Sequence, residues 1–147
     1  MTELNPTHSS KSTPPLRILP VLEKLKTAYL MWFKQYQLLP KAHRYSLGQK
    51  TDCLFIEVIE AVVAATFLPP LEKHPWVRLA IRKVDTIKVL LLILWEAGSL
   101  ETQKYAAVSV PLDEIGRILG GWNGQIQKAL EELKKKQNSH AGKAREK

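Results

Sequence analysis

The sequence predicts an all-α protein, an up-and-down four-helix bundle. Three observations predict this fold. Apolar residues recur with helical spacing over four long segments, no segment shows sustained strand-like alternation, and the predicted connections are short. The chain has 147 residues, 45% of them hydrophobic, which suits one globular domain. We expect a disordered arm at 1–16, the bundle at 17–122, and a short helix followed by a basic, disordered tail at 123–147.

The first helix is predicted to run from Ile18 to Leu39, because apolar and aromatic residues recur there at alternating spacings of four and three. Pro20 is suited to the first turn, and Pro40 prevents the helix from continuing. Residues 1–16 are rich in Thr, Ser, Asn and Pro and offer too little apolar surface to fold, which predicts the disordered arm.

The second helix is predicted to begin near Ser46, because Ser46 and Gln49 match a capping box, and to end at the next pair of prolines. Its narrow polar stripe predicts burial on more than one side. The third is predicted to begin at Pro75 and to end at Gly98. Its apolar run Val89–Trp95 needs a cover, but it is far shorter than the roughly 20 residues of a membrane span.

The fourth helix is predicted to run from Leu100 to Gly120, and Pro111 either bends it or separates two helices. The pair Gly120 and Gly121 predicts its end. Residues 126–133 predict a short helix with one apolar strip. From Lys134 onward, six basic residues against one acid predict the disordered tail.

The chain is basic, with a net charge of +8, and the charge is unevenly distributed. Residues 1–50 carry eight Lys or Arg against two acids, residues 51–98 carry five against six, and residues 99–147 carry nine against six. Such a surface favours association with polyanions. Cys53 is the only cysteine, so no internal disulfide can form, and we expect a cytoplasmic protein.

The sequence contains no pattern of catalytic or metal-binding residues, so we expect neither an enzyme, nor a metal, nor a cofactor. Glu57 and Glu60 share a helix face that is typical of a solvated stripe. The glycine-rich segment 120–124 follows a helix and lacks the ending of a phosphate-binding loop, so we expect its glycines to permit a turn and Trp122 to pack over the end of the bundle. The histidines fall in predicted loops or tails, at His8, His43, His74 and His140.

Two groups of residues are candidates for binding nucleic acid. In the predicted loop after the first helix, Lys and Arg could hold phosphates while Tyr stacks on a base. The alternative is that these charged loop residues only face solvent and bind nothing. This group consists of Lys41, Arg44, Tyr45 and Lys50. The tail adds Lys134, Lys135 and Lys136.

Arg78 and Arg82 share a face of the third helix with Asp85. We expect them to pair with Asp85 or with an acid of another helix. The alternative is that they contact a polyanion at a subunit interface or pore.

Two stretches together resemble a known family. Leu39 to Lys50, LPKAHRYSLGQK, resembles its pattern F-P-K-x-x-R-Y-x-L-G-Q, and Glu114 to Trp122, EIGRILGGW, resembles its pattern E-I-G-R-x-L-G-G-W. The family is the accessory variability determinant (Avd) of diversity-generating retroelements, a branch of four-helix-bundle proteins that also includes products of ribosomal RNA intervening sequences.

The resemblance implies a homopentameric, barrel-like assembly without a catalytic centre, which binds the reverse transcriptase of the retroelement and RNA or DNA and supports mutagenic cDNA synthesis. It adds Arg117 to the nucleic-acid-binding candidates. Its other matched positions are structural: Gly48, Gln49, Gly116, Gly120, Gly121 and Trp122. Two further functions stay open: an RNA-binding protein of the intervening-sequence type without a reverse transcriptase, and a structural oligomer whose charge aids solubility.

Overall fold

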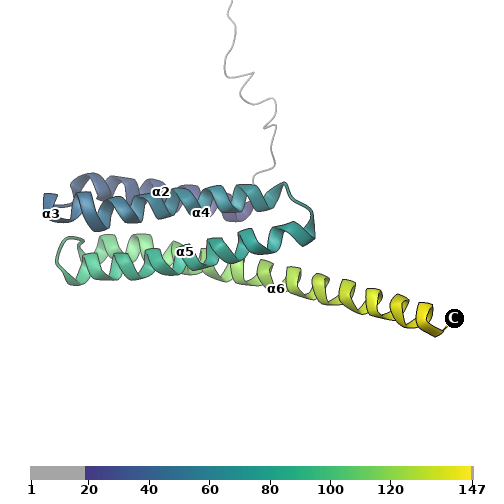
Figure 1. Cartoon of the computed structure of the whole chain (residues 1–147). Coiled ribbons are helices and arrows are strands. Elements are labelled where there is room, and N and C mark those ends of the chain that lie inside the picture. Colours follow the sequence, from purple (N-terminus) through teal and green to yellow (C-terminus); the bar gives the residue numbers. More distant parts are fainter. Residues whose placement is uncertain (1–18, 147) are drawn as a thin grey trace, which may run out of the picture.

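The computed structural model describes residues 19–146, with side-chain exposure described as far as residue 143. Over this range the chain forms an up-and-down bundle of four long helices (Figure 1). A short helix α3 (Lys41–His43) and a π-helical turn η1 (Arg44–Gly48) lead into the second of them. The four are α2 (Pro20–Leu38), α4 (Gln49–Thr66), α5 (Pro70–Glu96) and α6 (Thr102–Glu146). This confirms the predicted all-α, four-helix fold; the predicted arm at 1–16 lies outside the described residues.

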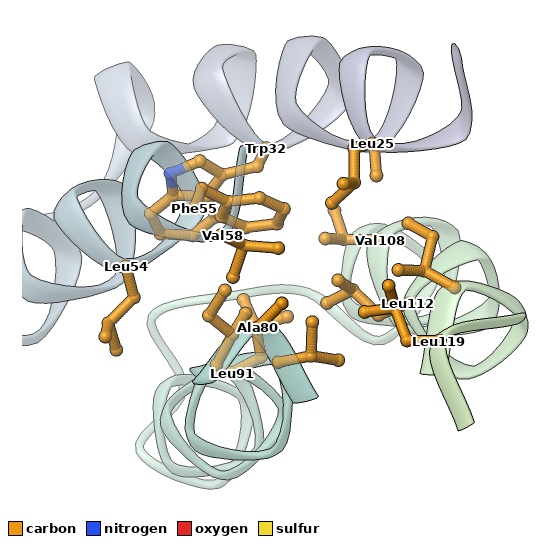
Figure 2. Packing of buried hydrophobic residues seen from close by; sticks show 14 of the residues in the cluster. Leu25, Trp32, Leu54, Phe55, Val58, Ala80, Leu91, Val108, Leu112 and Leu119 are labelled. Carbon is orange, nitrogen blue, oxygen red and sulfur yellow. The ribbon is translucent and has the colours of Figure 1, made fainter. Parts of the chain in front are cut away.

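The helices enclose one main core. Each helix packs on two neighbours, in the order α2, α4, α5, α6 and back to α2. Figure 2 shows side chains from all four converging, with Trp32 of α2 stacked on Phe55 of α4 at 6.1 Å between ring centroids. Both rings are fully buried. The Trp32 indole N–H donates to Asp52 Oδ1 at 3.2 Å, so its polar atom has a partner.

Three helix ends agree with the sequence. Pro20 is the first residue of α2, and Leu39, which precedes Pro40, has an extended backbone with ψ 146°. Gly98 adopts a φ of +82°, a left-handed conformation that glycine adopts without steric cost. Its N–H donates to Trp95 O at 3.0 Å and that of Ser99 donates to Leu94 O at 2.9 Å, the two bonds of a Schellman helix end.

The predicted helix starts at Ser46 and Pro75 are wrong. The chain is already helical from Lys41, and the Ser46 hydroxyl donates backwards to Ala42 O at 3.2 Å instead of capping. The third long helix begins at Pro70, five residues before Pro75. Leu71, whose carbonyl loses its N–H partner at Pro75, is exposed, so water can satisfy that carbonyl.

The predicted end of the fourth helix at Gly120–Gly121 is also wrong. Helix α6 continues through Pro111 and the glycines to Glu146, and the tail predicted to be disordered is helical. Buried side chains on both sides of Pro111 hold the two halves on one core, and Ile126 packs against α4 and α5 beyond the glycines. At 1.5 Å per residue α6 is about 67 Å long, and its last part projects from the bundle (Figure 1).

Candidate nucleic-acid interface

The structure divides the predicted nucleic-acid-binding residues into three groups. The first group lies in α3, η1 and the start of α4, at one end of the bundle: Lys41, Arg44, Tyr45 and Lys50. The second group lies on the neighbouring helices α5 and α6: Arg78, Arg82 and Arg117. The third group lies on the projecting part of α6: Lys134, Lys135 and Lys136. The structure does not bring the three groups together into one site.

In the first group, Arg44 is held by the fold. Its Nε and Nη2 atoms donate to the carbonyl oxygen of Leu39 at 3.1 and 2.8 Å. Leu39 follows the last residue of α2, so the guanidinium caps that helix at its C-terminal end, where a positive charge is favourable. Lys41 and Lys50 are exposed, and the Tyr45 ring is 66% exposed. The residues available to a ligand are therefore the two lysines, Tyr45 and the remaining N–H groups of Arg44.

The glycine of the first motif is required by packing. A Cβ at Gly48 would lie 2.7 Å from Leu39 Cδ1, 3.1 Å from His43 O and 3.2 Å from Tyr36 Cδ1. A side chain there would therefore displace the end of α2 or the turn that follows it. Gly48 and Arg44 together fix this turn to the end of α2. The glycine and the arginine of the first motif therefore have structural roles.

In the second group, the three arginines form a cationic surface near the middle of the bundle. Lys88 of α5 pairs with Asp113 of α6 at 3.2 Å, which puts these two residues at the same height. Because the helices are antiparallel, Arg82 and Arg117 are displaced in the same direction from that pair, by about 9 and 6 Å. Arg78 follows about one turn further. All three arginines are exposed.

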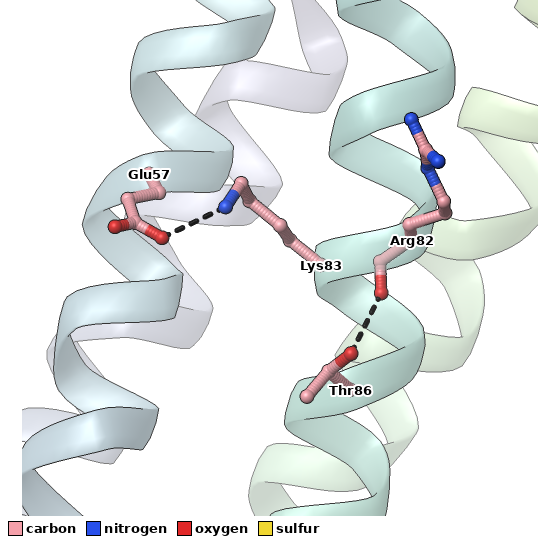
Figure 3. A network of polar contacts seen from close by, with 4 residues as sticks. All are labelled: Glu57, Arg82, Lys83 and Thr86. Carbon is pink, nitrogen blue, oxygen red and sulfur yellow. Dashed lines mark hydrogen bonds and ion pairs between the residues drawn. The ribbon is translucent and has the colours of Figure 1, made fainter.

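The expectation that Arg78 and Arg82 pair with acids is not met. Asp85 forms no ion pair with either arginine in the described residues. Figure 3 shows the Arg82 side chain directed away from the neighbouring pair between Lys83 and Glu57, whose charged atoms are 2.9 Å apart. The hydrogen bond from Lys83 lowers the pKa of the Glu57 carboxyl.

The ion pairs use a different set of lysines. Four pairs occur in the described part of the chain, and their cations are Lys24, Lys26, Lys83 and Lys88. Those lysines bind acids of their own helix or of a neighbouring one. None of the nine predicted lysines and arginines takes part, so none of them has a carboxylate in ion-pair contact among the described side chains. Arg117 is nonetheless close enough to Glu114 to contribute to the lowered pKa of that carboxyl.

The third group stands apart from the other two. Lys134 follows Arg117 by seventeen residues of one helix, which is about 25 Å. Every side chain from Glu131 to Lys143 is exposed. Glu131 and Glu132 precede Lys135 and Lys136 by four residues, a spacing that stabilises an exposed helix.

The second motif has both packed and open glycines. A Cβ at Gly116 would lie 3.3 Å from Lys88 Nζ, so this glycine leaves room for the lysine that pairs with Asp113. At Gly120 and Gly121 an added Cβ would meet nothing within 4 Å. Trp122 packs against the core as expected, but it does so from within α6, and the turn expected at 120–124 is absent.

The structure also exposes apolar surface on two opposite sides of the bundle. On α2 and α4, Phe33, Ile56 and Val63 are exposed, and Phe33 stacks on Tyr29, which contacts Phe55 of α4. We call this surface the α2/α4 face. On α5 and α6, the α5/α6 face consists of Val89, Leu92 and Val110. Part of the apolar end of the third helix, which was predicted to be covered, thus stays exposed within one chain.

Sequence reasoning missed a hollow at the end of the bundle where α4 joins α5. It has a volume of about 310 Å³, and its walls come from the first residues of α2, from α6, and from the helix ends on either side of the turn. The Lys73 ammonium lies 5.6 Å from the centroid of the Trp122 ring. No local pattern of the sequence predicts the hollow, because residues from four separate segments form its walls.

Among the described residues, no three His, Cys, Asp or Glu side chains are grouped so that they could hold a metal ion. No described helix combines the length and the apolar character that a membrane crossing requires. The sequence matches no protein-family model, and no curated protein matches it either.

Proposed function

We propose that the protein is a non-catalytic, ring-forming accessory factor of a diversity-generating retroelement. It binds template RNA or cDNA through its unpaired cations and holds it beside the partner reverse transcriptase. The two sequence motifs suggest the family, and the surface of the bundle supports a binding role.

The observation that carries the proposal is that the predicted nucleic-acid-binding cations are not the ones that pair with carboxylates. Four lysines pair with carboxylates, whereas the predicted nucleic-acid-binding residues form no ion pair in the described residues. Lys34, Lys73 and Lys104 are also without such a pair, so the lack of a partner leaves a cation available and does not by itself select it. Unpaired cations on a rigid surface can contact the phosphates of a nucleic acid directly and release the counterions that were condensed on it. Tyr45 adds an exposed ring on which a base can stack.

A set of charge-removing variants tests this proposal with a structured RNA as the probe. One variant carries Lys41→Gln and Lys50→Gln, and a second carries Arg78→Gln and Arg82→Gln. The matched control carries Lys26→Gln and Lys83→Gln, which removes the same charge from lysines that already have partners. Arg44 is left intact because its loss would disturb the turn after α2.

We expect each test variant to weaken RNA binding about tenfold in an electrophoretic mobility shift assay, since each removes two potential phosphate contacts. We expect the control to change the dissociation constant by less than about threefold. Equal losses in the test variants and the control would refute a specific role of the unpaired cations.

The opposite apolar faces support a ring. A closed ring needs two different, complementary surfaces on each subunit, and the α2/α4 face lies across the bundle from the α5/α6 face. Burying exposed Ile56 on one side and Val89 on the other would remove apolar area from water. A homopentamer is the ring that the family resemblance implies.

Two charge insertions distinguish a ring from a symmetric dimer. In a ring, Ile56→Glu and Val89→Glu should each give monomers in light scattering. An equal mixture should give heterodimers, because one intact face of each kind remains. In a symmetric dimer only one of the two variants would dissociate, and a monomeric unmodified protein at micromolar concentration would refute the assembly.

A further inference from the structure

We infer that the hollow beside Trp122, together with the apolar tip at the α4–α5 turn, is a docking site for a protein segment that carries an apolar anchor flanked by acidic residues. We define the tip as Phe67, Leu71 and Trp76. The inference rests on the proposed function only in expecting a protein partner, and it assigns that partner a place and a chemistry.

The tip exposes more apolar surface than the turn needs. Phe67 is 64% exposed, Leu71 is 60% exposed and Trp76 is 40% exposed. All three belong to the ten residues that close α4 and open α5, so the tight turn keeps them near one another. Large exposed apolar side chains grouped at one place mark an interaction site.

The hollow lies at the same turn as the tip and offers a place for an anchor, since Thr66 directly precedes Phe67 and Lys73 follows Leu71 by two residues. Thr66 and Lys73, which flank the turn, form one wall, and Ile118 and Trp122 of α6 form another. Its lining is mainly apolar, and its volume of about 310 Å³ is at the small end of the range for ligand sites. One or two large side chains of a partner would fill it, as anchor residues do in protein interfaces.

Charge defines the rest of the occupant. Lys73 lies over the Trp122 ring and has no carboxylate partner in the described residues. Arg78, further along α5, and Arg117 of α6 are exposed and likewise form no ion pair in the described residues. Acidic residues beside the anchor would pair with these cations, which favours an acidic partner over a basic one.

A protein segment fits better than nucleic acid or a membrane surface. The apolar walls give a base few partners for the polar atoms on its edge, which would lose their water on entry. A hollow walled by helices selects a side chain, whereas a membrane favours an apolar helix face lying in its plane.

The test uses the full chain labelled with fluorotryptophan and observed by ¹⁹F NMR. The probe is the capped peptide Glu-Glu-Phe-Leu-Glu-Glu, and its control replaces every Glu with Lys. The Trp122 resonance is assigned with Trp122→Phe. Two variants with the same charge change are compared: Lys73→Glu at the hollow, and Lys34→Glu about 20 Å away along α2.

We expect the acidic peptide to shift the Trp122 and Trp76 resonances saturably, with a dissociation constant of about 1 mM or tighter. Lys73→Glu should weaken this binding about tenfold, and Lys34→Glu should leave it unchanged. Circular dichroism establishes that both variants are folded. The peptide with lysines should bind at least about tenfold more weakly.

Several results would overturn the inference. No saturable shift, or equal binding of the two peptides, would remove the acidic segment as occupant. A Trp122 shift on dilution of the protein alone would assign the hollow to a second copy, and a shift with phosphatidylserine vesicles but not the peptide would assign it to a membrane. If Lys73→Glu weakened RNA binding as much as peptide binding, the hollow would be assigned to nucleic acid.

These results are separate from the proposed function. An unmodified protein that binds the acidic peptide but no RNA would refute the nucleic-acid proposal and leave the docking site in place. A protein that binds RNA but not the peptide would refute only the docking site.

Discussion

A single added methyl group should have opposite effects at two helical glycines of this chain. Gly48→Ala puts a Cβ 2.7 Å from Leu39 Cδ1 and 3.1 Å from the His43 carbonyl oxygen, closer than carbon atoms pack without displacement. Gly120→Ala puts a Cβ where nothing lies within 4 Å. Both positions are helical with ordinary backbone angles, so the two substitutions share the same gain in helix propensity and differ in packing.

The magnitudes follow from this geometry. Replacing Gly by Ala inside a helix stabilises by about 1 kcal/mol. Overpacking at the turn after α2 opposes this with about 1–3 kcal/mol. We therefore expect Gly120→Ala to raise the free energy of unfolding by up to about 1 kcal/mol. Gly48→Ala should lower it or leave it almost unchanged, so the two variants should differ by about 2 kcal/mol.

Urea unfolding followed by circular dichroism measures this difference, with all proteins at one concentration because assembly would make stability depend on concentration. The control is the unmodified chain. If Gly48→Ala stabilised the protein as much as Gly120→Ala does, the argument that packing requires the glycine of the first motif would be refuted.

Three further results are expected. Arg44→Gln should destabilise the fold by about 1–2 kcal/mol in urea unfolding, because the carbonyl of Leu39 loses two donors; no change would show that water replaces them. Burial and the nearby Asp52 carboxylate raise the pKa of Tyr29 to about 12, so its contribution to the free energy of unfolding is present below pH 10 and is lost as the pH rises towards 12. Unfolding of Tyr29→Phe should lack that part of the alkaline loss, and identical pH profiles would contradict the assignment. Because the Lys24 ammonium lowers the pKa of Glu114, acid below about pH 4.5 should destabilise the unmodified protein more than Glu114→Gln; equal losses would refute this pairing.

Much of the fold can be predicted from the sequence because several helix ends are set by local residues. Pro20 and Pro40 set the limits of α2 through backbone constraints that need no tertiary contact, and Gly98 ends α5 by adopting a conformation that few other residues reach. The seam of apolar residues at spacings of four and three correctly places Leu25 and Trp32 in the core, but the buried face of α2 also includes Val21 and Ala28, which the seam omits.

The errors arise where tertiary packing outweighs local preference. Pro111 costs a helix about 3 kcal/mol and each of the glycines costs about 1 kcal/mol. Burial of Leu112, Leu119 and Ile126 along one face of α6 offsets these costs, since each side chain contributes about 1.5–3 kcal/mol. Sequence periodicity identified the apolar positions but not which of the two effects would prevail.

The candidate site was predictable in residue type but not in arrangement. Lys41 and Arg117 could be selected from charge and motif, whereas the contact of Arg44 with the carbonyl of Leu39 depends on the turn after α2. The unpaired state of Arg82 depends on which helix faces its side chain. The hollow beside Trp122 requires four chain segments to meet, and no local pattern predicts that meeting.

The central claim is that unpaired cations of this bundle hold nucleic acid, and its most direct test is the salt dependence of binding to a structured RNA. Each phosphate contact releases counterions and contributes about −0.7 to −0.9 to the slope of log affinity against log salt concentration. We expect a slope of about −3 or steeper, which becomes shallower by about 1–2 when Arg78 and Arg82 are replaced by Gln. A flat salt dependence, or a slope unchanged by that replacement, would contradict it.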